Sequence, residues 1–157
     1  MRSKDTPGLA ELRALYAKTD ALMAPYDCDR STDCCRFGVT GREPYPTAVE
    51  RALLRRAIDA RGGPRAILRK NKSLPLADKP CPLLGPDGRC QVYADRPFGC
   101  RTFFCERAFH RDGGAAAKDP VLVHRDAVRE LGRDIAALSA QAFPTDPHPR
   151  PISRVLE

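Results

Sequence analysis

The chain has 157 residues, a length typical of a single domain, and its 27 basic and 20 acidic residues give a formal net charge of +7. Aromatic residues make up only 6% of the chain, so few side chains can bury a large area, and something besides apolar packing is expected to hold its middle together. No segment approaches the roughly 18 apolar residues of a membrane span, and the charged first residues lack the apolar run of a secretory signal, so the sequence predicts a cytoplasmic protein with no membrane partner.

The first predicted element is an amphipathic helix over about residues 7–24. Apolar side chains recur there at alternating steps of three and four residues, which places them on one stripe of a helix. Pro7 suits the first turn, and Pro25 follows the end. The stripe consists of Leu9, Leu12, Tyr16, Thr19 and Met23.

Two further helices are predicted along the chain. Thr47 and Glu50 have the spacing of a capping box, and the helix that they start is expected to end at Gly62-Gly63. A later helix follows the segment GGAAAK and has an apolar face. This face consists of Val128, Leu131, Ile135 and Leu138.

The remaining segments read as loops and turns. The residues after Pro64 are expected to form one short helical turn, and LLGPDGRCQVY predicts a tight hairpin around its Pro-Asp-Gly turn. RTFFCERAFHRDGG predicts a short helix or an extended turn. The last residues, PTDPHPRPISRVLE, contain four prolines and predict an extended or disordered tail.

These elements predict a mainly α fold: a small helical domain with irregular cysteine-bearing loops and one short β-hairpin, organised around a metal site. The chain divides into an N-terminal helix over 1–25, a cysteine-cluster domain over 26–142 and a flexible, proline-rich tail over 143–157.

Seven cysteines are the most informative residues of the sequence. They form two groups with 45 cysteine-free residues between them, and they stand beside Asp, Gly, Pro and Arg rather than on apolar helix faces. In a reducing compartment disulfides are rare, and an odd number cannot pair completely within one chain. Metal ligation is therefore the leading interpretation. The predicted ligands are Cys28, Cys34, Cys35, Cys81, Cys90, Cys100 and Cys105.

Thiolates suit both zinc and an iron–sulfur cluster. The spacings contain neither the paired C-x2-C knuckles of zinc ribbons nor a ferredoxin run, so they do not select between the two. Seven thiols exceed the four that one zinc ion needs. This surplus, with aromatic side chains expected to cover the site, favours an iron–sulfur cluster, for example of the 4Fe–4S type, over zinc.

The segment CPLLGPDGRCQVYADRPFGCR resembles the second half of the bacterial YkgJ-like cysteine-cluster family (CxxCxxCC type), whose members are described as zinc- or iron-chelating proteins. The shared features are an apolar pair after a cysteine, a Gly/Asp turn, a cysteine before a hydrophobic-Tyr step, an Arg-Pro pair and a final Cys-Arg. The Cys34-Cys35 pair matches the end of the family's first half, and the likeness covers about residues 26–105. In this chain the features of the second half correspond to Cys81, Leu83, Leu84, Asp87, Gly88, Cys90, Val92, Tyr93, Arg96, Pro97, Cys100 and Arg101.

One departure from the family pattern concerns its first half. The family usually has two spaced cysteines ahead of the Cys-Cys pair, whereas this chain has only Cys28, followed by DRSTD. Cys105 is an addition to the common Cys-Arg ending. We therefore expect Cys105 to replace the missing ligand.

The other residues near the cysteines have expected roles at the same site or nearby. Arg96 is expected to shape the turn before Cys100 or to bind a substrate, and Arg101 to donate to cluster sulfur or to remain solvated. These two arginines are the candidate cofactor-binding residues. Tyr93, Phe98, Phe103 and Phe104 are expected to cover the site, whereas Asp29, Asp33, His110, His124 and His148 are weaker ligand candidates.

Three functions remain open from the sequence. The first is a metal- or cluster-binding protein that serves as a redox, assembly or accessory factor, with an unknown protein partner. The second is a zinc-stabilised module that binds nucleic acid or protein, although basic and acidic residues are interleaved along the chain. The third is a thiol oxidoreductase that uses Cys34-Cys35 or Cys100 and Cys105. No enzyme signature stands beside the cysteines, so catalytic residues are unknown.

Overall fold

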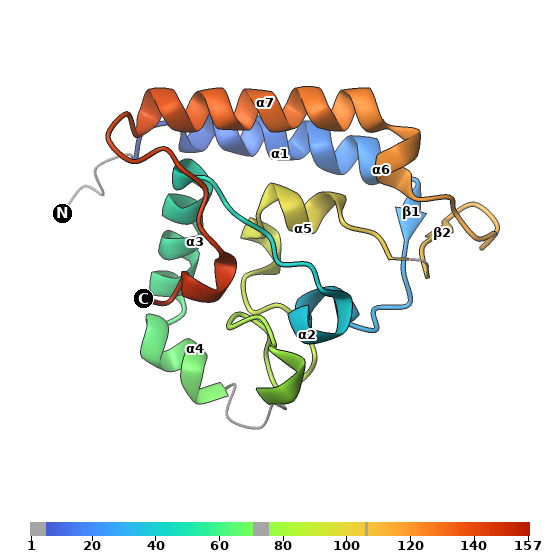
Figure 1. Cartoon of the computed structure of the whole chain (residues 1–157), viewed down its shortest axis with the longest axis horizontal. Helices are drawn as coiled ribbons and strands as arrows, with labels where there is room; N and C mark the ends of the chain where they lie inside the picture. The colour runs from blue at the N-terminus through green and yellow to red at the C-terminus, as the bar shows by residue number, and fades with distance from the viewer. Residues whose placement is uncertain (1–5, 71–75, 106) are drawn as a thin grey trace.

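The computed structural model describes residues 6–70, 76–105 and 107–157 (Figure 1). The fold is mainly helical, as the sequence predicts. Its helices are α1 (Leu9–Met23), α2 (Phe37–Thr40), α3 (Ala48–Ala60), α4 (Pro64–Lys70), α5 (Phe98–Thr102), α6 (Pro120–Val123) and α7 (Arg125–Ala142), with 3-10 turns η1 (Asp33–Cys35), η2 (Leu76–Asp78), η3 (Tyr93–Asp95) and η4 (Ile152–Arg154) and strands β1 (Tyr26–Asp27) and β2 (Phe109–His110).

Helices α1 and α7 lie side by side along one edge of the molecule, and α3 approaches them from below in the view of Figure 1. The predicted stripe of α1 is buried as expected. Helix α3 begins with the predicted capping box, because the Glu50 carboxylate accepts from the backbone N–H of Thr47 at 2.8 Å. The three long helices predicted from the sequence, two from apolar spacing and α3 from its capping box, are thus confirmed.

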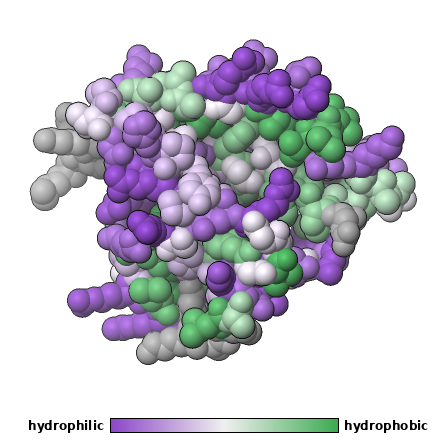
Figure 2. All heavy atoms as spheres, in the orientation of Figure 1, coloured by the Kyte–Doolittle hydropathy of each residue, from purple (hydrophilic) through white to green (hydrophobic). Residues whose placement is uncertain are grey.

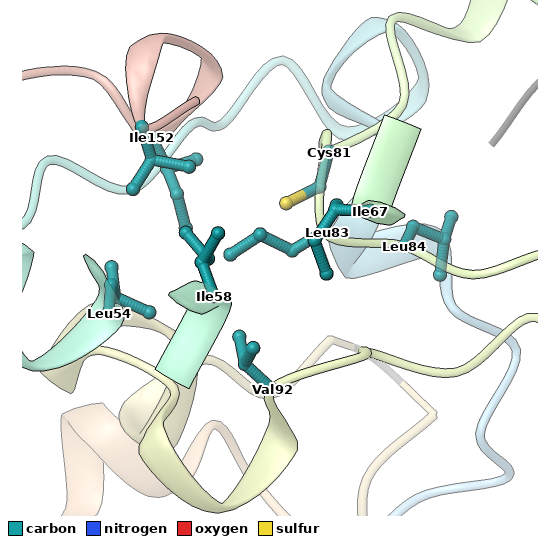
Figure 3. Close-up of a cluster of buried hydrophobic side chains, with 9 residues drawn as sticks. Leu54, Ile58, Ile67, Cys81, Leu83, Leu84, Val92 and Ile152 are labelled. Carbon is teal, nitrogen blue, oxygen red and sulfur yellow. The ribbon is translucent and has the colours of Figure 1, made fainter. Parts of the chain in front are cut away.

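Helix α3 contributes to two separate apolar clusters. Val49 and Leu53 pack with α1 and α7 in the helical cluster, whereas Leu54 and Ile58 pack in a second cluster that includes Cys81. Figure 3 shows Cys81 among the apolar side chains of this second cluster. Helix α3 therefore separates the helical cluster from the part of the molecule that carries most of the cysteines. We call this second part, built around the cluster of Cys81, the cysteine lobe.

The β-strands among the described residues form one two-stranded ribbon. Strands β1 and β2 pair antiparallel, with Tyr26 opposite His110 and Asp27 opposite Phe109. The hairpin predicted in LLGPDGRCQVY forms around a single bridge between Leu84 and Cys90. The turn in it places Gly88 at a φ of 73°, a conformation that glycine adopts without steric cost.

Two segments near the middle and the end of the chain differ in detail from expectation. The helical turn expected after Pro64 extends into the seven-residue helix α4, and the last predicted helix is interrupted at His124 between α6 and α7. No helix within the described ranges combines the length and the apolar character needed to cross a membrane.

The C-terminal segment, for which the sequence predicts an extended or disordered tail, packs against the fold. The backbone N–H of Ile152 donates to the carbonyl of Pro44 at 3.0 Å, and that of Arg150 donates to Pro46 at 3.1 Å. Ile152 is only 1% exposed, and it joins Val155 in the cluster around Cys81. Apolar packing and backbone hydrogen bonds together anchor a segment that is otherwise polar and proline-rich. The division of the chain into three parts stays a prediction.

Candidate metal centre

The first pair of cysteines is positioned by backbone pairing between distant segments. Cys34 and Cys35 lie in η1, and the Cys35 carbonyl accepts from the backbone N–H of Cys81 at 2.7 Å. The bridge between Arg36 and Pro80 extends this contact. Gly38 permits the close approach, because a Cβ there would lie 2.8 Å from the carbonyl oxygen of Asp78.

The hairpin that follows Cys81 places the next thiol. The backbone N–H of Gln91 donates to the carbonyl of Leu83 at 2.8 Å, and Gly85 donates to Arg89 at 2.7 Å. Leu83 and Leu84 are almost fully buried, which fixes the hairpin on the apolar cluster. Cys90 therefore returns to the side of the lobe that holds Cys81.

Cys100 lies in the short helix α5 rather than in the loop that the sequence predicts. The start of α5 is fixed from outside, because the backbone N–H of Phe98 donates to the buried Glu50 carboxylate at 2.7 Å. The same carboxylate accepts from the Tyr16 hydroxyl at 2.9 Å. Cys100 is thus positioned by contacts that reach α1 and α3.

The thiols of these segments influence one another electrostatically. Burial, followed by the nearby charges of Cys81, Cys90 and Cys34, raises the pKa of Cys100 well above its ordinary value. Burial also raises the pKa of Cys90, and the pKa of Cys81 to about 12. These mutual effects show that thiols from three separate segments lie in one region. We call the set the central cysteines: Cys34, Cys35, Cys81, Cys90 and Cys100.

The vicinal pair is the tightest contact within this set. The Sγ atoms of Cys34 and Cys35 are 3.9 Å apart, and the hydrogen bond between them lowers the pKa of Cys34 to about 7 and raises that of Cys35. Two sulfurs bound tetrahedrally to zinc at about 2.3 Å would be about 3.8 Å apart. The spacing of this pair therefore fits thiolate ligands of one ion.

The central cysteines do not surround a common point as the ligands of a bound metal would. Among the described residues, no three Cys, His, Asp or Glu side chains converge closely enough to hold a metal ion as they stand. The donor type nevertheless fits a soft metal, because the central cysteines are thiols that share one partly buried region.

Cys28 and Cys105 are placed by other contacts. Cys28 follows strand β1, and its backbone N–H donates to the Asp27 carboxylate at 2.9 Å. The Cys105 carbonyl accepts from the backbone N–H of Ala108, next to β2. These two cysteines therefore lie by the ribbon rather than in the hairpin and η1 segments.

The two candidate cofactor-binding arginines differ in their surroundings. The Arg96 charge lowers the pKa of both Cys90 and Cys100, so its guanidinium lies near the central cysteines. It also stacks on the Tyr93 ring at 4.0 Å. Arg101 is 5% exposed and donates to the Asp20 carboxylate at 2.5 Å and to two backbone carbonyls, so its bonds tie α5 to α1 and η3.

The predicted aromatic cover is not seen as such. Tyr93 is 62% exposed, and Phe98 packs in the helical cluster with α1, α3 and α7. Phe103 lies under the Arg42 guanidinium, and Phe104 contacts the Tyr26 ring edge-on. For Phe98 the expectation of a shared aromatic cover was wrong, because the helical core holds this ring, whereas for Tyr93, Phe103 and Phe104 it stays a prediction.

The weaker ligand candidates have other partners. Asp29 and Asp33 both pair with Arg107, at 3.5 and 3.3 Å. His124 Nε2 and the Tyr26 hydroxyl are hydrogen-bonded at 2.8 Å, and His110 packs against the same Tyr26 ring. The carbonyl of His148 accepts from Arg51.

The sequence reasoning missed two charged neighbours of the thiols. The Arg61 charge lowers the pKa of Cys90, and the Glu43 charge raises that of Cys81. Both residues are far from those cysteines in sequence, and no local spacing marks them. The second role of Glu50, as the acceptor that positions α5, was also missed because the capping box alone accounted for this residue.

The comparisons with known proteins give one match. A family model named CxxCxxCC and described as "Putative zinc- or iron-chelating domain" matches residues 27–118, which is more than half of the chain and includes all seven cysteines. Counted from Cys28, the pattern in that name places its second cysteine at position 31, where this chain has Ser31. No curated protein and no solved structure matches the chain.

Proposed function

The chain belongs to the family of zinc- or iron-chelating CxxCxxCC domains, and on that premise we propose that it binds zinc or an iron–sulfur cluster through the thiolates of the central cysteines. One observation supports this proposal most strongly. Thiols from η1, the hairpin and α5, segments far apart in sequence, influence one another's pKa within one partly buried region.

The electrostatics of these thiols explain why a cation would be bound. Burial and mutual repulsion raise the pKa of Cys81, Cys90 and Cys100, so several thiolates at this place require positive charge to stabilise them. A bound metal supplies that charge, and its binding free energy adds to folding stability. Zinc would link the segments without redox chemistry, whereas an iron–sulfur cluster would also carry electrons.

We assign the protein an accessory role, in redox transfer or assembly, rather than complete catalysis. The polar groups that position α5, the helix of Cys100, are engaged in bonds that hold the fold. Glu50 accepts from Tyr16, Thr47 and Phe98, and Arg101 donates to Asp20 and to the carbonyls of Ala94 and Arg96. These bonds support a structural or electron-carrying metal better than an acid–base reaction at the same place.

The deciding experiment is elemental analysis of the full chain purified without oxygen, combined with its visible spectrum. Zinc without colour would assign a structural zinc site. Iron with inorganic sulfide and a brown colour would assign an iron–sulfur cluster. A chain that contains neither metal, and binds neither after reconstitution, would overturn the proposal.

Substitutions of single cysteines test the ligand set. Cys90→Ser and Cys100→Ser are each expected to lose most of the bound metal, because each removes a thiolate. Ile58→Val is the matched control: it lies in the same apolar cluster and should cost about 0.5–1.5 kcal/mol of stability. Metal retained in both cysteine variants, or lost equally in Ile58→Val, would contradict the proposed ligands.

A second candidate function is favoured by one surface. Five arginines are exposed on α3, on α4 and on the turn between them, where Asp59 is the one exposed acid. None of the ion pairs found among the described residues involves these arginines. Figure 2 shows hydrophilic side chains projecting from the edge where Figure 1 places α4. The surface consists of Arg55, Arg56, Arg61, Arg65 and Arg69.

Unpaired guanidinium groups on one face suit the phosphates of a nucleic acid. Fluorescence anisotropy with a single-stranded RNA oligonucleotide, at several salt concentrations, tests this function. Removal of one arginine that binds a phosphate should lower the salt slope by about 1. Arg65→Gln with Arg69→Gln should therefore weaken binding, whereas Arg129→Gln with Arg133→Gln on α7, where acids alternate with the arginines, should not. No binding at physiological salt would exclude the function.

A further inference from the structure

The loop between Cys28 and the Cys34-Cys35 pair carries Ser31 where the family pattern has a cysteine. A serine hydroxyl is a hard and rarely ionised donor, so it is a poor ligand for a metal that thiolates hold. Ser31 is also engaged within its own loop. Its backbone N–H donates to the Asp29 carboxylate at 3.1 Å, and its hydroxyl accepts from the backbone N–H of Asp33 at 3.4 Å.

We propose that Cys105 supplies to the metal centre the thiolate that the pattern places at position 31. The inference rests on the proposed metal-binding function and adds a residue to it. It is carried by the position of the Cys105 segment, which lies along the loop that contains Ser31.

The β1–β2 ribbon sets this position. Its register pairs Asp27 with Phe109, and Cys28 and Ala108 are the residues that adjoin this last pair in the sequence. The backbone N–H of Ala108 donates to the Cys105 carbonyl at 3.0 Å. Cys105 is therefore bonded to the residue that directly precedes β2.

Arg107, two residues after Cys105, holds the loop by two ion pairs. One guanidinium nitrogen of Arg107 pairs with Asp29 at 3.5 Å, and the other pairs with Asp33 at 3.3 Å. These two aspartates flank Ser31 in the sequence. The turn that carries Cys105 is thus held across the loop in which the cysteine is replaced.

The chain also links Cys105 to the central cysteines. Cys100 is one of them, and Cys105 follows five positions later, after α5 ends at Thr102. The segment that supplies one thiol to the centre therefore continues directly to Cys105. A ligand missing from one segment is replaced from the segment that pairs with it.

The test measures zinc and iron affinity of the full chain by competition with a chelator, together with metal content. Cys105→Ser should weaken binding by more than about 100-fold, because substitutions of residues that merely orient a ligand cost about 10–100-fold. Adding Ser31→Cys to this variant should restore both affinity and metal content. Circular dichroism checks that each variant remains folded.

A matched control is Cys105→Ser with Ser153→Cys, which adds a thiol at an exposed serine elsewhere and should not restore binding. Binding unchanged by Cys105→Ser, a loss below about 100-fold, or a failure of Ser31→Cys to restore metal would each overturn the inference. If one of these results is found while the wild-type chain binds metal and Cys90→Ser does not, the inference has failed and the metal-binding function stands. Failure of the metal-binding function is recognised by a wild-type chain that binds none.

Discussion

At the scale of single residues, the thiols of the cysteine lobe are expected to change their protonation state when a cation binds. Without one, burial holds Cys81, Cys90 and Cys100 in the protonated form at neutral pH, since it raises the pKa of each. With a metal bound, the same thiols would be thiolates, and their protons would be released. Metal binding is therefore expected to tighten as the pH rises.

The metal-free protein is expected to lose stability at alkaline pH. A thiol whose pKa is raised in the folded state stabilises the fold below the unfolded value, about 8.5, and loses that contribution as the pH rises towards the folded value. For Cys81 this window runs from about 8.5 to the folded pKa of about 12. Cys34, whose pKa is lowered to about 7, has the opposite effect on stability. It adds stability as the pH rises from about 7 to about 8.5, which is below the window of Cys81.

Urea unfolding at pH 8 and at about pH 10, with chelator and with bound metal, checks this expectation. The free energy of unfolding should fall with pH in the chelated protein and should change little in the loaded one. Equal falls in both states would show that the thiols are not the groups responsible.

Arg101 is expected to stabilise the fold rather than to contact the metal. Lysine in its place cannot donate to Asp20 and to two carbonyls together, so Arg101→Lys should lower the free energy of unfolding by about 1–3 kcal/mol. Metal content and visible spectrum should stay unchanged. Arg133→Lys, on the exposed face of α7, is the control. A spectral change in Arg101→Lys without loss of stability would point to a cofactor contact instead.

At the scale of elements, Glu50 connects three helices. Its carboxylate caps α3 through Thr47, accepts from Tyr16 of α1, and accepts from the first N–H of α5. Because α5 carries Cys100, a residue at the start of one helix controls where a central thiol lies. The position of Cys100 therefore depends on a group that is buried in a different layer.

Glu50→Gln tests this connection. Glutamine offers one carbonyl oxygen where Glu50 offers two, so at least one buried N–H of Thr47 or Phe98 is left unpaired, at a cost of about 1–3 kcal/mol. Metal release to a chelator should also become faster, because α5 is less firmly held. Glu130→Gln, exposed on α7, should change neither quantity. A stable variant with normal release would show that α5 is fixed by other contacts.

Helices with a clear apolar period could be predicted from the sequence, and segments placed by distant partners could not. The stripe of α1 and the Thr47–Glu50 cap of α3 are local signals, and both are confirmed. The pairing of Cys35 with Cys81 depends on backbone bonds across about 45 residues, which no local spacing encodes. The same holds for Phe98, which was expected at the metal site and packs in the helical cluster.

At the scale of the whole molecule, the C-terminal segment closes the cysteine lobe. Ile152 and Val155 lie in the apolar cluster with Cys81. Leu156, the apolar residue that follows them, packs against the same cluster. The hydroxyl of Ser139, buried in α7, donates to the carbonyl of Pro147 and so directs the segment back along α3. The end of the chain is therefore part of the lobe's core.

Ile152→Ala is expected to lower the free energy of unfolding by about 2–5 kcal/mol, because the residue is fully buried. The metal-free protein should be affected more visibly, since bound metal adds stability of its own. Thermal unfolding with and without chelator measures both effects. Arg154→Ala, exposed in the same turn, is the control. Equal stability of the two variants would mean that the segment does not contribute to the core.

The position of α3 between two clusters has a practical consequence for isolating the metal-binding part. The family match covers residues 27–118 and leaves out both α1 and α7. A fragment cut to that range would expose Val49 and Leu53, which those helices cover in the full chain. Such a fragment is expected to aggregate on expression, even with its cysteines intact. The segment that matches the family is thus covered on one side by α1 and α7, which lie outside the matched residues.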